Sequence, residues 1–381
     1  MRYLLLRLKR FCGFIVGFVF FVSGILKLLD PVGASLVVKE YYQFLHMDFL
    51  NATAMVFALI FAFSEAVIGA GLVTGVWRRI IAPIAVGMQG FFTLLTLALV
   101  IFNPEMDCGC FGEAIHLTHG QTFIKNLILL ALLLIYYIPA KHLGETRKKK
   151  YVSFAIVCIS AAAFGIYSLL YIPLQDFTYL SAGTEINKAE NTYQATFVYE
   201  KDGKQENFTL ENLPDSTWTY VRTDSAPGGQ GEDSPVISIY SENGDYADSL
   251  LTDGNVMIVS LYKDNQDAED MAEIMTFMEQ AGDNGFTPLL LTSFPLENAP
   301  SYHYMCDYKT LITLNRSNSG ATYLNNGYII RKWAKRTLPA PEELAMISDE
   351  DSTETFIGRD TKTSLAFQGF LLYVFAVMLL L

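Results

Sequence analysis

The sequence predicts an α-helical membrane bundle joined to an α/β domain that lies outside the membrane. Residues 1–173 and the C-terminal residues hold six long apolar segments, whereas residues 174–365 have the composition of an ordinary soluble domain. That soluble stretch carries 13 Lys and Arg against 31 Asp and Glu, and the rest of the chain is net basic. Because phosphate binding needs a basic surface, we expect no nucleic-acid partner, and the apolar segments predict contact with a lipid bilayer.

Each apolar segment is tested by its length, because a helix needs about 20 apolar residues to cross a bilayer. Six segments approach or meet this length, at Phe11–Leu29, Ala52–Val76, Ile80–Phe102, Thr122–Ile138, Val152–Ile172 and Ser364–Leu381. We expect a four-helix core over residues 1–140, a basic loop and fifth helix over 141–173, and a C-terminal helix over 364–381. The first segment is long for a cleaved signal peptide, and no clean small-residue cleavage site follows it.

Basic residues predict the orientation of these helices. Lys and Arg cluster in three connections, at residues 2–10, 78–79 and 141–150. Cytoplasmic loops are enriched in Lys and Arg, and assigning all three clusters to the cytoplasm gives a consistent alternation of helices. We therefore predict a multi-pass membrane protein with a cytoplasmic N-terminus and with the large domain on the outer side of the membrane.

Two cysteines, Cys108 and Cys110, flank Gly109 in the short loop between the third and fourth apolar segments. The predicted orientation places this loop in an oxidising compartment, where disulfides form. A bridge between residues two apart requires a tight turn, which Gly109 permits, and strain makes such a bridge a better oxidant than a structural one. Cys108 and Cys110 are therefore the first catalytic candidates. A structural disulfide or two idle thiols is the alternative interpretation.

A second alternative is a metal site in the same loop. Cys108, Cys110, His116 and His119 supply two sulfur and two imidazole ligands, a set that suits zinc or copper. The gap of two residues between the histidines is short for one zinc ion, so our prediction assigns no metal and keeps this site as an alternative.

Ionisable and polar residues inside the apolar segments are further candidates. Glu65 lies near the middle of the second segment, where a carboxylate is costly and marks a functional site by default. We predict that Glu65 is the third catalytic residue, a proton donor or acceptor, with a protonated or paired packing residue as the alternative. Lys27 in the first segment and Gln89 in the third are the predicted cofactor-binding residues. Their alternatives are a snorkelling anchor and an interhelical hydrogen bond.

The order of these motifs resembles the DoxX/MauE-like membrane proteins. The residues that carry the resemblance are Ser23-Gly24-Ile25-Leu26-Lys27 with Asp30-Pro31, then Glu65 with Ile68-Gly69-x-Gly71-Leu72, then Cys108-Gly109-Cys110-Phe111-Gly112. The resemblance implies a four-helix membrane fold over about residues 10–140. It also implies a link to methylamine utilisation, to disulfide formation and to quinone-linked thiol redox balance. The whole layout is similar to a Bacteroidota DoxX-family type with an added periplasmic domain, which implies a multi-pass protein of the bacterial inner membrane with its large domain in the periplasm.

The soluble stretch has a strand, helix, strand and hairpin pattern. Strands are expected at Val256–Tyr262 and Thr287–Thr292 around a helix at Asp267–Gly282, and Asn325-Asn326-Gly327 marks a hairpin turn. Residues 254–340 resemble a thioredoxin-like domain of the TlpA type. This domain lacks the Cys-x-x-Cys pair around residues 263–266, and Ser319 stands where that family places a cis-proline.

Three further segments complete the predicted organisation. Residues 174–253 are expected to form a β-rich periplasmic segment with a hairpin at Asp202-Gly203, and residues 341–363 an acidic linker. Cys306 is the only cysteine of the thioredoxin-like region, so it is either a buried thiol or a partner for Cys108 or Cys110.

Together these features predict periplasmic thiol/disulfide exchange, or envelope redox balance, through Cys108 and Cys110. Such a protein would be a thiol/disulfide or quinone-linked oxidoreductase, with quinone as the candidate cofactor and an envelope protein as client. A function of a different class is a non-catalytic scaffold, in which the periplasmic domain binds an envelope partner complex and the cysteines only close a loop.

Overall fold

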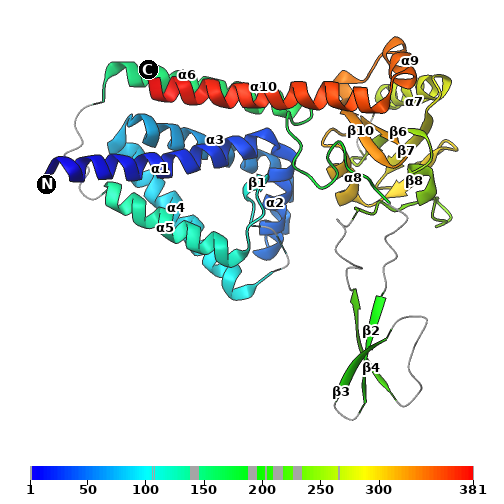
Figure 1. Cartoon of the computed structure of the whole chain (residues 1–381), viewed down its shortest axis with the longest axis horizontal. Helices are drawn as coiled ribbons and strands as arrows, with labels where there is room; N and C mark the ends of the chain where they lie inside the picture. Colours follow the sequence, from blue (N-terminus) through cyan, green and yellow to red (C-terminus); the bar gives the residue numbers. More distant parts are fainter. Residues whose placement is uncertain are drawn as a thin grey trace.

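The membrane bundle is confirmed in the computed structural model of the chain, which describes residues 2–104, 106, 108–137, 146–187, 195–201, 204–208, 218–225, 234–264 and 267–380. Within these residues, six helices are long and apolar enough to cross a membrane. They are α1 (Arg2–Leu29), α3 (Ala54–Thr74), α4 (Arg78–Phe102), α5 (His119–Tyr137), α6 (Lys148–Leu170) and α10 (Ser352–Leu380). Figure 1 shows the N- and C-termini at the same end of this bundle, opposite the mixed sheet.

Small residues let α1 and α3 approach closely. A Cβ atom added at Gly24 would meet the backbone of Ala66, and one added at Gly17 would meet the carbonyl oxygen of Gly69. Helices in lipid associate through packing rather than through a hydrophobic driving force, so such contacts stabilise the bundle. At the end where both termini lie, Lys150 of α6 donates to the carbonyl oxygen of Met378 in α10, 2.9 Å away. Both helices also have buried residues in one core cluster with α1 and α3, so α6 and α10 belong to the same bundle.

The connection between α1 and α3 contains a helix that the sequence patterns did not predict, α2 (Pro31–Phe44), followed by the 3-10 turn η1 (Asp48–Thr53). Asp30 caps α2 by accepting a hydrogen bond from the Gly33 N–H at 2.9 Å, and Pro31 occupies the first helical position. Both features stabilise a helix start. The connection between α4 and α5 holds the cysteines and the short strand β1 (Cys110–Glu113).

A six-stranded mixed sheet lies at one end of the bundle (Figure 1). Its strands are β5 (Ile239–Tyr240), β6 (Asn255–Leu261), β7 (Thr287–Thr292), β8 (His303–Cys306), β9 (Gly320–Asn325) and β10 (Tyr328–Trp333). Its helices are α7 (Ala268–Asp283), α8 (Tyr308–Leu314) and α9 (Pro341–Asp349), with 3-10 turns η3 (Asp248–Leu251) and η4 (Lys335–Thr337). We call residues 174–187 and 234–349 the sheet domain.

The strand order is β10-β9-β6-β7-β8-β5. Strands β6, β7 and β8 are parallel, β9 runs antiparallel to β6 and to β10, and β5 runs antiparallel to β8. Alternating residues of β6 face two cores, because side chains of a strand alternate between the faces of a sheet. Met257 and Val259 pack on the α7 side, whereas Val256 and Ile258 pack in the cluster that includes α8.

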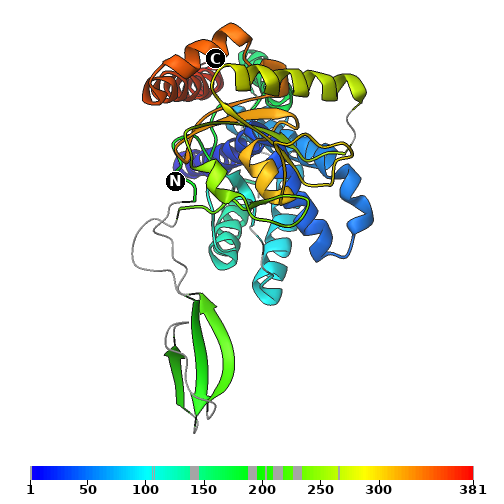
Figure 2. The ribbon, with the colours of Figure 1, turned by 90° about the vertical axis from the view of Figure 1, so that its right-hand side faces the viewer.

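A second sheet contains β2 (Ala195–Lys201), β3 (Lys204–Phe208) and β4 (Thr219–Ser225), in the antiparallel order β3-β2-β4. Both views show it projecting away from the sheet domain (Figures 1 and 2). The predicted hairpin strands around Asp202-Gly203 are confirmed, and those two turn residues lie outside the described residues. The segment at residues 341–363, which we expected to be an acidic linker, folds as α9 and the first turns of α10.

Candidate active site

The cysteine loop, which we define as residues 108–113, lies against α1 and α2. Cys108 is buried and Cys110 is half-buried. Gly109 adopts a left-handed backbone angle, φ +57°, which residues with a side chain rarely adopt. A Cβ atom at this position would also collide with the side chain of Val37 in α2. The close approach of the loop to α2 therefore requires glycine between the two cysteines.

Two hydroxyl groups hold the backbone on either side of Gly109. Ser23 of α1 donates to the carbonyl oxygen of Cys110 at 2.6 Å, and Tyr41 of α2 donates to the carbonyl oxygen of Cys108 at 3.0 Å. Burial raises the pKa of Tyr41 well above its ordinary value, and the neighbouring Cys110 and Cys108 raise it further. Tyr41 therefore keeps its proton and remains a donor. The sequence patterns did not assign a role to Tyr41.

A histidine contacts the buried cysteine. His119, the first residue of α5, places its Nδ1 atom 3.7 Å from the Cys108 sulfur. Its other ring nitrogen, Nε2, lies 3.1 Å from the carbonyl oxygen of Pro104, which can only accept a hydrogen bond. In the neutral ring this assigns the proton to Nε2 and leaves the lone pair of Nδ1 facing the thiol. The sequence analysis named His119 only as an alternative metal ligand, whereas this contact allows its Nδ1 atom to accept the proton of the Cys108 thiol.

The two predicted ionisable residues of the bundle form a pair. Lys27 Nζ lies 2.6 Å from Glu65 Oε2, and Glu65 is only 3% exposed. The Ser23 hydroxyl is 3.2 Å from the same carboxylate oxygen, so a single side chain touches both the ion pair and the backbone of Cys110. A buried charge requires a partner of opposite charge, and here Lys27 and Glu65 are each other's partner. The structure therefore places Glu65 and Lys27 next to the cysteine loop.

Gln89 joins two helices. Its Nε2 donates to the carbonyl oxygen of Asn126 in α5 at 3.0 Å, which matches the interhelical alternative. Gln89 also borders a small space of about 30 Å³ that Glu65, Lys27 and Cys110 line. Lys125, next to Asn126, places its ammonium over the ring of Phe111 at 4.6 Å, a cation–π contact with the cysteine loop.

An apolar cavity of about 540 Å³ lies beside the cysteine loop, among α2, η1, α3 and α4. Its lining includes Cys108, Gly109 and Cys110 on one side and the rings of Phe57, Phe61, Phe91 and Phe92 among its other walls. The few polar groups that border it include Lys27 and Tyr41. A concave apolar site with few polar groups is typical of a small-molecule site.

The metal alternative receives no support from the described part of the chain. Among those residues, no group of three or more His, Cys, Asp or Glu side chains could hold a metal ion. His119 faces Cys108, whereas His116 is exposed. Asp107, which precedes Cys108, lies outside the described residues.

The sheet domain offers a poorly reactive thiol. Cys306 is 2% exposed in the core of the domain, and burial raises the pKa of its thiol to about 12. Because the thiolate is the nucleophile, Cys306 is a weak one at neutral pH. Ser319, at the position compared with the cis-proline, has φ +61° and donates its N–H to the carbonyl oxygen of Ser260 at 2.8 Å.

Comparison with known proteins gives two family matches. Residues 3–139 match the family described as Methylamine utilisation protein MauE, which confirms the predicted resemblance of the membrane domain. Residues 193–226, which include β2, β3 and β4, match a domain of unknown function, DUF8463.

One curated relative is Protein TlpB of Flavobacterium psychrophilum, which is 27% identical over 218 residues. The match covers 55% of this chain and 54% of the relative, so the chain spans about half the length of that protein. No solved structure matches the chain.

Proposed function

We propose that this chain, whose residues 3–139 match the MauE family, carries out thiol/disulfide exchange through Cys108 and Cys110. The observation that supports the proposal most is the surroundings of the pair. Both cysteines line an apolar cavity, and Cys108 contacts His119. The Ser23 hydroxyl contacts both the Lys27–Glu65 ion pair and the carbonyl oxygen of Cys110. Idle thiols would need neither a histidine nor a buried ion pair beside them.

The exchange begins with the two sulfurs joined as a disulfide. A client thiolate attacks the sulfur of Cys110, which is the more exposed of the two. The bond between the sulfurs breaks, and Cys108 leaves as a thiolate that takes a proton from His119, whose Nδ1 atom has taken up the proton that the first client thiol lost. A second client thiolate then attacks the client sulfur of the mixed disulfide and releases Cys110 as a thiolate, which takes from water the proton that the second client thiol lost. The client gains a disulfide, and the pair gains two electrons and two protons.

The pair must be reoxidised, and the apolar cavity fits a quinone for this purpose. Its aromatic walls suit a flat apolar ring, and the Lys27 ammonium, which borders the cavity, has N–H donors besides the one that faces Glu65 to offer a ring oxygen. A quinone bound there would supply the two-electron, two-proton oxidant for the dithiol. His119 takes the thiol proton of Cys108 in this half of the cycle. Glu65 and Lys27 form the nearest buried acid and base that can hold the protons.

The sheet domain is proposed to be thioredoxin-like and to act as a binding module. In support, β6, α7, β7, α8 and the β9–β10 hairpin come in this order in the chain, with β8 between β7 and α8, and four of the six strands are ordered β10-β9-β6-β7. The region after β6 has no cysteine pair in the sequence, so this domain would bind a client rather than oxidise it.

We place the sheet domain and the cysteine loop on the periplasmic side of an inner membrane. Three basic connections fit a cytoplasmic location, including the one that begins α6 with Lys148, Lys149 and Lys150. The common end of the two chain termini in Figure 1 supports the same arrangement.

Trapping tests this proposal. In Cys108→Ser, Cys110 can still form the mixed disulfide by attacking a client disulfide, the reverse of the exchange above. Cys108 is then missing as the thiol that would release the client, so we expect a covalent adduct with an envelope protein to accumulate. The adduct is detected on non-reducing gels of isolated membranes and disappears with dithiothreitol. Cys306→Ser is the matched control and leaves adduct formation unchanged. If neither Cys108→Ser nor Cys110→Ser yields an adduct, the exchange function is wrong.

A non-catalytic scaffold is the second candidate, favoured by the sheet domain, which lacks a cysteine pair of its own. The double variant Cys108→Ala/Cys110→Ala distinguishes the two functions. A scaffold co-purifies its envelope partners unchanged in this variant, and an exchange protein loses every partner held through sulfur.

A further inference from the structure

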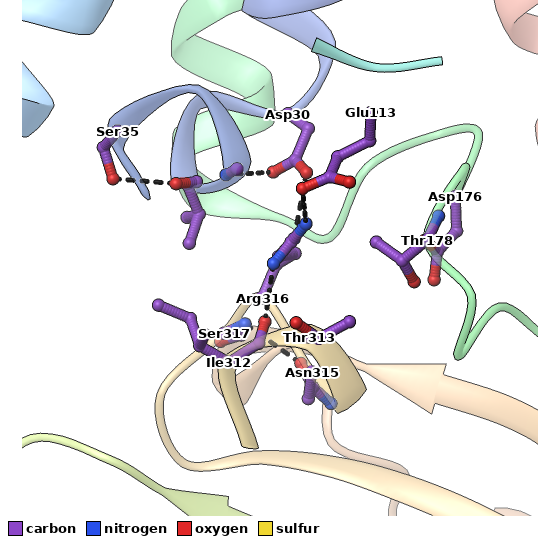
Figure 3. Close-up of polar contacts among 12 residues, drawn as sticks. Asp30, Ser35, Glu113, Asp176, Thr178, Ile312, Thr313, Asn315, Arg316 and Ser317 are labelled. Atoms are coloured by element: carbon purple, nitrogen blue, oxygen red, sulfur yellow. Dashed lines mark hydrogen bonds and ion pairs between the residues drawn. The ribbon is translucent and has the colours of Figure 1, made fainter. Parts of the chain in front are cut away.

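Arg316 joins the sheet domain to the membrane domain. It lies just beyond α8 and is 8% exposed. Its Nε atom donates to Asp30 Oδ2 at 2.9 Å, and its Nη2 atom donates to Glu113 Oε1 at 3.1 Å. The third donor, Nη1, bonds the carbonyl oxygen of Ile312 at 3.0 Å within the sheet domain. Figure 3 shows the Arg316 side chain reaching from the sheet domain toward the neighbouring carboxylates of Asp30 and Glu113.

The two carboxylates keep this arginine charged in a buried position. Burial alone would lower the pKa of Arg316, but Asp30 and Glu113 outweigh it, and the pKa is raised. A planar guanidinium can serve two carboxylates at once through separate N–H groups, which a lysine ammonium does less well.

Both partners of Arg316 are attached to the cysteine site. Glu113 is the last residue of β1, the strand that begins at Cys110. Asp30 is the N-cap of α2, the helix whose Tyr41 holds the Cys108 carbonyl group. The guanidinium therefore contacts one end of each element that positions the cysteines.

The helix α2 links the sheet domain to the cavity. Val32 and Leu36, four residues apart, pack against the core cluster of the sheet domain. On the opposite face, Val37, Val38 and Tyr41 line the cavity next to Cys108 and Cys110. Residues four apart share one face of a helix, so α2 forms a wall with a different neighbour on each side.

We propose that Arg316 is a positioning residue through which the sheet domain sets the reactivity of the Cys108–Cys110 pair. Arg316 clamps Glu113 and Asp30, and so holds the cysteine loop and α2 together. A protein that binds the sheet domain and moves Arg316 would loosen the loop and expose Cys110. The inference deepens the proposed function, because it gives the sheet domain without a cysteine pair a role in regulating that site.

The test measures the alkylation rate of Cys110 by N-ethylmaleimide in the reduced full-length protein, resolved from Cys108 by peptide fragmentation. Arg316→Gln is expected to raise this rate about fivefold, because the loop opens locally more often without the clamp. Glu113→Gln removes the loop end of the same clamp and is expected to raise it similarly. Arg316→Lys restores part of the protection, because its ammonium can still pair with one carboxylate.

The matched control is Arg331→Gln, which breaks the 3.0 Å ion pair with Glu343 inside the sheet domain. It should leave the Cys110 rate unchanged. The double variant Arg316→Gln/Glu113→Gln should react no faster than Arg316→Gln alone, because both substitutions remove one interaction.

An unchanged Cys110 rate in Arg316→Gln, an equal rise in Arg331→Gln, or additive effects in the double variant would each overturn the inference. Alkylation is measured on the reduced thiol and needs no exchange partner. A failure of the clamp is therefore distinguishable from a failure of the exchange function.

Discussion

Replacing Glu65 by leucine is expected to destabilise the membrane domain by about 3–5 kcal/mol, because Lys27 is then left as an unpaired buried charge. The pair is held at 2.6 Å with Glu65 almost fully enclosed, so the substitution removes the buried partner of the Lys27 ammonium. Thermal unfolding of the purified protein in detergent, followed by circular dichroism, measures the loss.

A second substitution separates the structural role of the pair from its catalytic role. The double variant Lys27→Met/Glu65→Leu removes both charges and should recover most of the lost stability, since apolar replacement of a whole buried pair is often neutral. If the pair serves proton transfer, this folded variant still loses thiol reoxidation. If it reoxidises the cysteines at the wild-type rate, Glu65 and Lys27 only stabilise the bundle.

Replacing His119 by asparagine is expected to slow alkylation of Cys108 about tenfold at pH 7, because an imidazolium stabilises a thiolate and an amide does not. Nδ1 lies 3.7 Å from the sulfur, and asparagine keeps a polar group near that position. Loss of the imidazolium cation disfavours the thiolate, and so slows alkylation, at any pH at which the thiol is mostly protonated. At about pH 10 a thiol ionises without help, and the rates of variant and wild type should meet.

The control for this prediction is His116→Asn, three residues earlier on an exposed part of the same connection. It should leave the alkylation rate of Cys108 unchanged at both pH values. An equal change at pH 7 and pH 10 in His119→Asn would show altered access to the sulfur instead, and would contradict a role for His119 in forming the thiolate.

Features with a local signal in the sequence were predictable. The apolar runs located α1, α3, α4, α5, α6 and α10, because the bilayer sets both their length and their composition. The β6–α7–β7 unit and the hairpin at Asn326-Gly327 follow from periodicity and turn chemistry. The sequence grouped Glu65 with Cys110 only because both belong to the motifs of the family resemblance, and it did not predict that the two residues lie close together.

Features that depend on distant contacts were missed. α2 follows a good N-cap at Asp30, but its apolar residues face two different neighbours, so no single stripe marks it. Arg316 has no pattern that separates it from the other basic residues, because its partners are 286 and 203 positions away in the chain. His119 was noticed for its spacing from the cysteines, yet its neighbour Pro104, which orients the ring, was not.

The central claim is that Cys108 and Cys110 exchange electrons with a quinone, and their redox state in isolated membranes tests it most directly. Membranes are reduced, freed of reductant, divided, and incubated with or without an added short-chain quinone before alkylation with a mass-tagged maleimide. The proposed function predicts that the pair becomes protected from alkylation only with the quinone, and not in Lys27→Met/Glu65→Leu. If both thiols remain fully alkylated under every condition, the quinone does not oxidise the pair and the claim is wrong.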